Sequence, residues 1–192
     1  MQKTEDRALL DLARAFDFAA RRHVQQRRKG EAAEPYVNHL AEVTALLAEA
    51  TGGNDPVLLI GALLHDTIED QDVTAAEIET AFGPDVAALV VEVTDDKSLP
   101  KVERKRLQIE HAPHKTRRGK LLKLADKISN LRSIAKAPPA WPIQRQRDYI
   151  VWAESVVAGL RGASPALERL FDQAADQARA AVEARAAAVT QT

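Results

Sequence analysis

The segment VLLIGALLHDTIED (residues 57–70) joins an almost purely apolar run to a short group of ionisable residues. Asp55 and Pro56 stand directly before it, a capping side chain followed by a residue that favours the first position of a helix. The segment therefore predicts a buried helix whose last turn carries His65 and a group of carboxylates.

Helical periodicity continues through most of the chain. A capping box at Thr74 and Glu77 predicts a short helix that ends near Phe82. The other predicted helices cover about 5–27, with its apolar face at Leu9, Leu12, Ala13, Phe16, Ala19 and Ala20; 39–50, with Asn38 as the N-cap; 84–96; 102–112; 117–135; 143–161; and a helix from Pro165 into an alanine-rich tail. The sequence thus predicts an all-α fold, one domain over 1–192 with its core at about 5–175, a frayed end and at most a small β-hairpin at 36–38.

Composition excludes several classes of protein. The chain has 192 residues, 45% of them hydrophobic and 29% charged, as in ordinary globular domains. A net charge of −1 and few aromatic residues argue against nucleic acid or an anionic membrane as a partner. Without cysteine there is no disulfide or thiolate metal site. No apolar stretch reaches the ~20 residues of a membrane span, and the start does not read as a signal peptide, so the sequence predicts a cytosolic protein.

His65, Asp66, Glu69 and Asp70 share spacings of three and four residues, which place side chains on one face of a helix. Carboxylates so close together repel one another, and a divalent cation removes that conflict. Mixed imidazole and carboxylate ligands suit such an ion. The alternative is a solvated acidic helix end with no ligand role.

A metal site needs further ligands from elsewhere in the chain. His39 stands near a predicted helix start, and Asp126 interrupts the apolar stripe of residues 121–131. An unpaired buried carboxylate is costly, so Asp126 requires a cation or a hydrogen-bond network. The alternatives are an ion pair of Asp126 with Lys123, Lys127 or Arg132, and a hydrogen bond at the helix start for His39.

Two basic stretches, RRHVQQRRK (21–29) and ERKRLQ (103–108), stand out in a chain without net positive charge. They are either solvated surface or local patches for a ligand with several phosphates. In the second case Lys101, Lys105 and Arg106 are candidates to attract phosphate.

Four segments occur in one order and at characteristic spacings: residues 23–39 (HVQQRRKGEAAEPYVNH), 62–70 (ALLHDTIED), 92–108 (EVTDDKSLPKVERKRLQ) and 123–132 (KLADKISNLR). Together they resemble the hydrolase domain of Rel/Spo-type alarmone enzymes in the HD superfamily. The similarity covers about residues 5–175 and is strongest to the stand-alone small alarmone hydrolases, including those of metazoan type.

The resemblance implies an HD-type helical bundle with one Mn²⁺ per chain, held by His39, His65, Asp66 and Asp126. It places Glu69 and Asp70 at the catalytic carboxylates. The resemblance further implies a substrate-binding set of Arg28 and Lys29 near phosphates, and Asn130 and Tyr149 at the nucleoside.

The activity implied is removal of pyrophosphate from the 3′ position of guanosine 3′-diphosphate 5′-di- or triphosphate. No synthetase or regulatory domain follows in the sequence, so a hydrolase without the opposing activity is expected. The expected partner is a small nucleotide, and the oligomeric state is left open. The alternatives are a phosphatase for another ribose-phosphorylated nucleotide such as NADPH and a catalytically silent nucleotide sensor.

Overall fold

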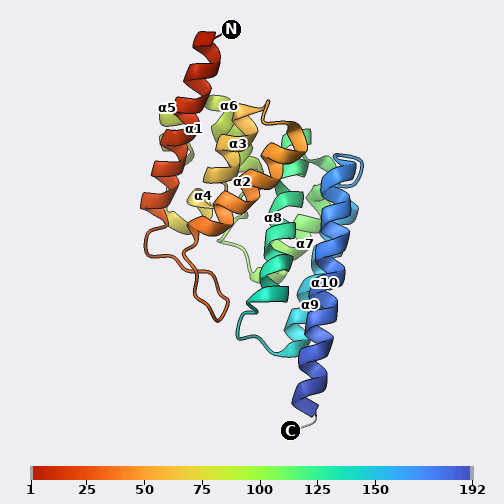
Figure 1. The fold of residues 1–192 in the computed structure, drawn as a ribbon. Helices are drawn as coiled ribbons and strands as arrows, with labels where there is room; N and C mark the ends of the chain where they lie inside the picture. Colours follow the sequence, from red (N-terminus) through yellow and green to blue (C-terminus); the bar gives the residue numbers. More distant parts are fainter. Residues whose placement is uncertain (1, 191–192) are drawn as a thin grey trace. The chain divides into compact units, whose positions relative to one another are not determined.

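The computed structural model describes residues 2–190, which fold into helices joined by short loops (Figure 1). The helices are α1 (Gln2–Arg22), α2 (Val37–Thr51), α3 (Pro56–Leu64), α4 (Thr67–Gln71), α5 (Ala75–Phe82), α6 (Pro84–Val93), α7 (Lys101–His111), the 3₁₀ turn η1 (Ala112–His114), α8 (Arg117–Lys136), α9 (Ile143–Ala158) and α10 (Pro165–Thr190). Within residues 2–190 no strand is formed, which confirms the predicted all-α fold.

Contacts along the chain define two compact units. One unit comprises Met1–Gln26 and Pro35–Arg104, and the other comprises Arg27–Glu34 and Lys105–Thr192. The second unit therefore includes a loop that lies, in sequence, between α1 and α2. The single domain over residues 1–192 stays a prediction.

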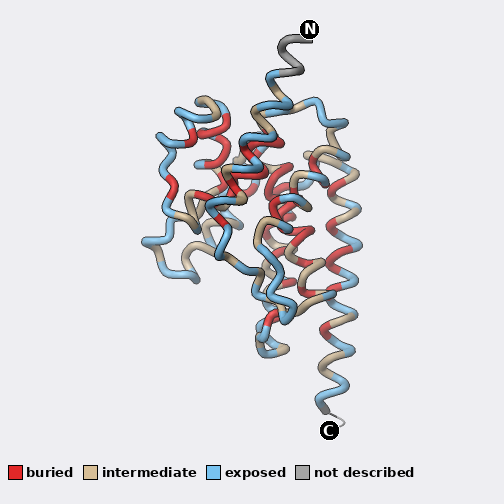
Figure 2. Tube along the Cα trace, turned by 60° about the vertical axis from the view of Figure 1, so that its left-hand side comes forward, coloured by how far each residue is buried: buried red, intermediate tan, exposed pale blue. Residues whose placement is uncertain are grey.

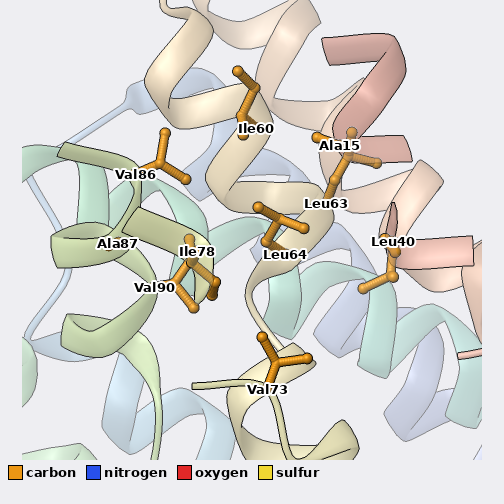
Figure 3. Close-up of a cluster of buried hydrophobic side chains, with 11 residues drawn as sticks. Ala15, Leu40, Ile60, Leu63, Leu64, Val73, Ile78, Val86, Ala87 and Val90 are labelled. Carbon is orange, nitrogen blue, oxygen red and sulfur yellow. The ribbon is translucent and has the colours of Figure 1, made fainter. Parts of the chain in front are cut away.

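Helix α3 is the centre of the first unit, where it packs against α1, α2 and α6. Its residues from Leu58 to Leu64 are all buried. A helix that is apolar on every side must be enclosed by other elements. Figure 3 shows Leu63 and Leu64 of α3 among side chains from the neighbouring helices, including Ala15 of α1 and Val90 of α6.

The predicted starts of two helices in this unit are confirmed by their caps. The Asp55 carboxylate accepts a hydrogen bond from the Leu58 amide at 3.1 Å, with Pro56 at the first position of α3. Thr74 and Glu77 form both halves of a capping box at α5. Each cap satisfies amides that a helix start leaves without a partner.

The second unit is built around α8, which packs against α9 and α10. The predicted apolar stripe of α8 is buried throughout: Leu121, Leu122, Leu124, Ala125, Ile128 and Leu131. Figure 2 shows the alternation of buried and exposed positions along the long C-terminal helix. Burial in α10 reaches Ala178 and Val182, beyond the predicted core limit near residue 175. The predicted fraying falls partly on residues 191–192, which lie outside the described part.

The loop 27–34 is fixed to the segment that follows α8. Gly30 forms an isolated bridge with Pro139, and the Glu31 amide donates to the Pro138 carbonyl at 3.3 Å. A Cβ atom at Gly30 would lie 2.2 Å from the Ala137 carbonyl oxygen, so only glycine fits this approach.

Helix α1 differs from its prediction in length and in its buried face. It ends at Arg22 instead of near residue 27, because the chain turns at residues 23–26, where the Gln26 amide donates to the His23 carbonyl. Leu9 and Phe16 were predicted to face the core but are 68% and 45% exposed. Ala19 of the predicted face is buried, as is Ala15, which was not predicted.

Two predictions about the start of α2 were wrong. Helix α2 begins at Val37, so Asn38 lies inside it and is not the N-cap. Residues 36–38 form no hairpin, because the Asn38 amide donates to the Pro35 carbonyl at 3.1 Å and the helical turn starts there. Proline restricts the backbone at this point and favours such a start.

Candidate active site

The buried helix predicted to run from Pro56 through residue 70 is divided in two. Helix α3 ends at Leu64, and α4 begins at Thr67, whose hydroxyl donates to the Leu64 carbonyl at 2.6 Å. Asp66 leaves helical geometry, with φ of −101° and ψ of 0°. The assumption of one continuous helical face for His65, Asp66, Glu69 and Asp70 was therefore wrong.

His39 of α2 and His65 point their rings toward one another inside the first unit. Both are buried, with exposed fractions of 2% and 3%, and their ring centroids lie 5.3 Å apart. His65 Nδ1 donates to the Ala62 carbonyl at 2.7 Å, which places the lone pair of the neutral ring on Nε2. That Nε2 lies 3.0 Å from Asp66 Oδ2, and His39 Nε2 lies 3.7 Å from the same oxygen.

Tyr36 adds a fourth side chain to this group. Its hydroxyl donates to Asp66 Oδ2 at 2.5 Å, and its ring stacks on His23 with centroids 5.1 Å apart. Sequence reasoning did not select Tyr36, although it stands only three residues before His39. The tyrosine fixes the Asp66 carboxylate in the orientation that faces both imidazoles.

Glu69 and Asp70 of α4 are each held by groups from elsewhere in the first unit. Glu69 accepts from the Asp95 amide at 3.4 Å and lies 3.6 Å from an Arg104 nitrogen. Asp70 accepts from Lys97 at 2.6 Å and from the Gln26 amide nitrogen at 2.8 Å. None of the residues that hold these carboxylates was predicted, because their sequence separation gives no periodic signal.

Asp126 lies on α8 in the second unit and is 7% exposed, which agrees with its place in the apolar stripe. It accepts from Lys127 at 3.0 Å and from the Asn130 amide nitrogen at 2.6 Å. The alternative of an ion pair with Lys127 is therefore confirmed as a contact. That contact leaves room for a ligand role, since a carboxylate has about four acceptor sites.

Arg28 and Asn130 are in contact within the second unit. Arg28 Nη1 donates to Asn130 Oδ1 at 3.1 Å. Asn130 thus connects the guanidinium of Arg28 with the carboxylate of Asp126. Lys29, the other predicted phosphate-binding residue, is exposed.

Tyr149 lies in an aromatic group on α9 and the loop before it. Its ring centroid is 5.9 Å from that of Trp141 and 5.3 Å from that of Trp152. Lys105 Nζ lies 4.6 Å from the Trp152 centroid and 5.9 Å from that of Tyr149, distances at which a cation is attracted to a ring face. The two tryptophans were not predicted.

The remaining predicted cations are on the surface of α7. Lys101 and Arg106 are both exposed, and Arg106 forms an ion pair with Glu110 one helical turn away. Such an exposed pair contributes little to stability.

The ligand types suit a divalent transition metal. His39 and His65 in the first unit and Asp126 in the second unit are buried, and each carries an atom of a kind that binds metal ions. Imidazole nitrogen and carboxylate oxygen together are typical of sites for manganese, iron and zinc. In the first unit, Asp66 Oδ2 lies 3.0 Å from His65 Nε2 and 3.7 Å from His39 Nε2, so each of these two pairs could share one ion at bonds of about 2 Å.

Comparisons with known proteins agree with these observations. Residues 15–160 match the family model described as HD domain. The chain is 52% identical over 159 residues to the guanosine-3′,5′-bis(diphosphate) 3′-pyrophosphohydrolase MESH1 of Xenopus tropicalis, covering 82% of this chain and 89% of that protein. It is 51% identical over 167 residues to the human MESH1, covering 84% and 93%.

A solved structure has the same fold. It is described as a metazoan orthologue of SpoT that hydrolyses ppGpp, and it superposes with a TM-score of 0.84 at 46% identity. The match covers 87% of this chain and 94% of the other.

Proposed function

The chain belongs to the HD domain family, and we propose that it is a guanosine-3′,5′-bis(diphosphate) 3′-pyrophosphohydrolase. It hydrolyses ppGpp and pppGpp at the 3′ position and releases pyrophosphate with GDP or GTP. This function is supported mainly by one observation. Over more than four fifths of its length, the chain is about half identical in sequence to enzymes of that name.

The metal ligands in this proposal are His39, His65, Asp66 and Asp126. The burial of the two histidines and of Asp126 supports the assignment, as does the approach of both Nε2 atoms to Asp66 Oδ2. When bound, one Mn²⁺ per chain supplies a Lewis acid and lowers the pKa of a coordinated water. Manganese is proposed over magnesium because Mg²⁺ prefers oxygen ligands, whereas His39 and His65 supply two nitrogen ligands.

Glu69 and Asp70 are the proposed acid–base pair. They follow Asp66 within four residues, and each accepts hydrogen bonds from groups elsewhere in the first unit. One of these carboxylates accepts the proton of the attacking water as the bond between phosphorus and the 3′-oxygen breaks, and the departing 3′-oxygen receives a proton from this pair. Such assistance is typically worth about 10²–10⁴ in rate.

The substrate phosphates are proposed to bind to Arg28 and Lys29, with Lys101, Lys105 and Arg106 as further cations. Asn130 and Tyr149 are proposed to line the nucleoside site. The contact between Arg28 and Asn130 supports a shared role for these two residues. The rings around Tyr149 offer apolar faces of the kind on which bases stack.

Among the described helices, none has the length and apolar character needed to cross a bilayer. The predicted cytosolic location and the absence of a nucleic-acid partner stay predictions.

Product analysis tests the proposed function. The purified protein is incubated with Mn²⁺ and guanosine 3′,5′-bis(diphosphate), and the products are separated by chromatography. GDP and pyrophosphate in equal amounts are expected, while Glu69→Gln should abolish most of the turnover. NADPH and a nucleoside 3′-monophosphate are tested in parallel, and a higher kcat/KM for either of them would contradict the proposal.

A further inference from the structure

Gln26 lies at the turn after α1 and contacts Asp70, although 44 positions separate them in sequence. Its Nε2 donates to Asp70 Oδ2 at 2.8 Å. On the other side, Lys97 Nζ lies 2.6 Å from Asp70 Oδ1. Both carboxylate oxygens of Asp70 are therefore engaged, one by an amide and one by an ammonium group.

The orientation of the Gln26 amide is fixed by its own neighbours. His23 Nδ1 lies 2.5 Å from Gln26 Oε1, and Gln71 Nε2 donates to the same oxygen at 2.6 Å. Because Gln71 donates to Oε1, the NH₂ group of Gln26 must face Asp70. His23 is itself 2% exposed and stacked on Tyr36, so one of the two groups that orient Gln26 has little freedom to move.

The two donors to Asp70 differ in how firmly they are held. The Lys97 side chain is 50% exposed, and an ion pair of that kind is screened by water and salt. Helix α4 has only five residues, so it provides little rigidity of its own. The ordered amide of Gln26 is thus the constraint best able to fix the direction of the Asp70 carboxylate.

We propose that Gln26 is a positioning residue, whose amide, oriented by His23 and Gln71, holds the Asp70 carboxylate in the direction needed for hydrolysis. This inference rests on the proposed catalytic role of Asp70. Gln26 contacts no reacting atom in this scheme and acts only through the hydrogen bond to Asp70.

The test compares three variants in steady-state hydrolysis of guanosine 3′,5′-bis(diphosphate) with Mn²⁺. Gln26→Ala removes the amide, and Gln26→Glu keeps its size but replaces the donor by an acceptor. The neighbouring Gln25 is exposed, so Gln25→Ala is the matched control. Melting temperature and bound metal are measured for each variant, so that loss of folding is separated from loss of positioning.

Gln26→Ala and Gln26→Glu are both expected to lower kcat about tenfold or more, the effect of losing one hydrogen bond to a charged group. KM should stay within about twofold, because no substrate contact is lost. In an Asp70→Asn background the Gln26 substitutions should have no further effect, since the two residues act as one unit. Gln25→Ala should behave as the wild type.

Wild-type kcat in Gln26→Glu would overturn the inference, because it would show that only the volume of the side chain matters. The inference would also be overturned if Gln26→Ala lowered kcat in the Asp70→Asn background by as much as it does in the wild type. Gln26 would then act on another group. Turnover at the wild-type rate in the single variant Asp70→Asn is distinguishable from these two outcomes. It would contradict the proposed role of Asp70 and leave the HD-family hydrolase activity standing.

Discussion

Asn130 Nδ2 donates to Asp126 Oδ1 across 2.6 Å, while the carbonyl oxygen of the same amide accepts from Arg28 at 3.1 Å. One side chain therefore contacts both a proposed metal ligand and a proposed phosphate-binding residue. Partners behind a metal ligand orient it and adjust its basicity. Metal affinity and substrate affinity should consequently depend on each other through Asn130.

Asn130→Ala is expected to weaken Mn²⁺ binding by about 10- to 100-fold, the usual cost of removing the group that orients a ligand. The same variant should raise KM, because Arg28 loses its acceptor. A calorimetric titration with Mn²⁺ measures the first effect. The exposed Asn54 offers a control of the same residue type, and equal Mn²⁺ affinity in Asn54→Ala and Asn130→Ala would contradict the prediction.

Asp126→Asn should remove most of the bound metal while it preserves the shape of the side chain. In the wild type, chelation should lower the melting temperature and added Mn²⁺ should restore it. A free metal concentration of about 100 times Kd stabilises the folded state by about 2.7 kcal/mol. In Asp126→Asn neither treatment should shift the melting temperature. Full metal content in this variant, measured by elemental analysis, would remove Asp126 from the ligand set.

Glu69→Gln and Asp70→Asn should keep the fold and the metal but lose about 10² or more in kcat, since each replaces a proton acceptor by an isosteric amide. Rapid-mixing assays measure kcat, elemental analysis of the same samples measures bound metal, and the melting temperature reports the fold. If both variants turned over substrate at the wild-type rate, the assignment of the acid–base pair would be wrong. Loss of metal in one of them would make that residue a ligand.

Arg28→Ala should reduce kcat/KM more than Lys29→Ala, because Arg28 is half-buried and Lys29 is exposed. A charged hydrogen bond worth about 1.5–3 kcal/mol corresponds to about 10- to 150-fold in kcat/KM. Arg21 belongs to the same basic stretch and is paired with Asp17 at the surface, so Arg21→Ala is the matched control. An equal effect of all three substitutions would show that only the overall charge of the stretch matters.

His23 should make stability depend on pH. Burial is the main cause that lowers the pKa of His23 below its ordinary 6.5, with smaller opposing effects from Gln26 and nearby carboxylates. As pH falls through about 6.5, the unfolded chain takes up a proton at this position that the folded protein does not. The stability that depends on a neutral His23 is therefore present at high pH and lost in acid.

The measurement is urea unfolding between about pH 8 and pH 5. His23→Gln should reduce the decline of unfolding free energy toward low pH. His114 is exposed, and His114→Gln should leave the decline as in the wild type. Identical slopes in the wild type and His23→Gln would contradict the prediction.

Local signals explain what the sequence predicted well. The caps at Asp55 and Thr74 act over three residues, and the stripe of α8 repeats with the helical period, so both can be recognised without tertiary information. Asp126 could be selected for the same reason, because a carboxylate inside an apolar stripe is visible in the sequence.

The parts that were missed depend on contacts between distant segments. The Tyr36 hydroxyl donates to the Asp66 carboxylate at the break between α3 and α4, and the Asp70 carboxylate accepts from Gln26 and Lys97. No periodicity connects these residues. The apolar pattern of α1 was also ambiguous, because both of its faces carry apolar residues, and only packing decides that Ala15 is buried while Leu9 and Phe16 are exposed.

The close approach of Gly30 to Ala137 matters for how natural sequence variation in this chain should be interpreted. Every other amino acid at position 30 would collide with a backbone carbonyl, so the loop that carries Arg28 would have to move. If Arg28 binds substrate phosphate as proposed, a natural variant at Gly30 would thus resemble a defect in substrate affinity, although this glycine has no side chain with which to bind anything. A method that scores variants only at residues in contact with the ligand would therefore miss the effect of a substitution at Gly30.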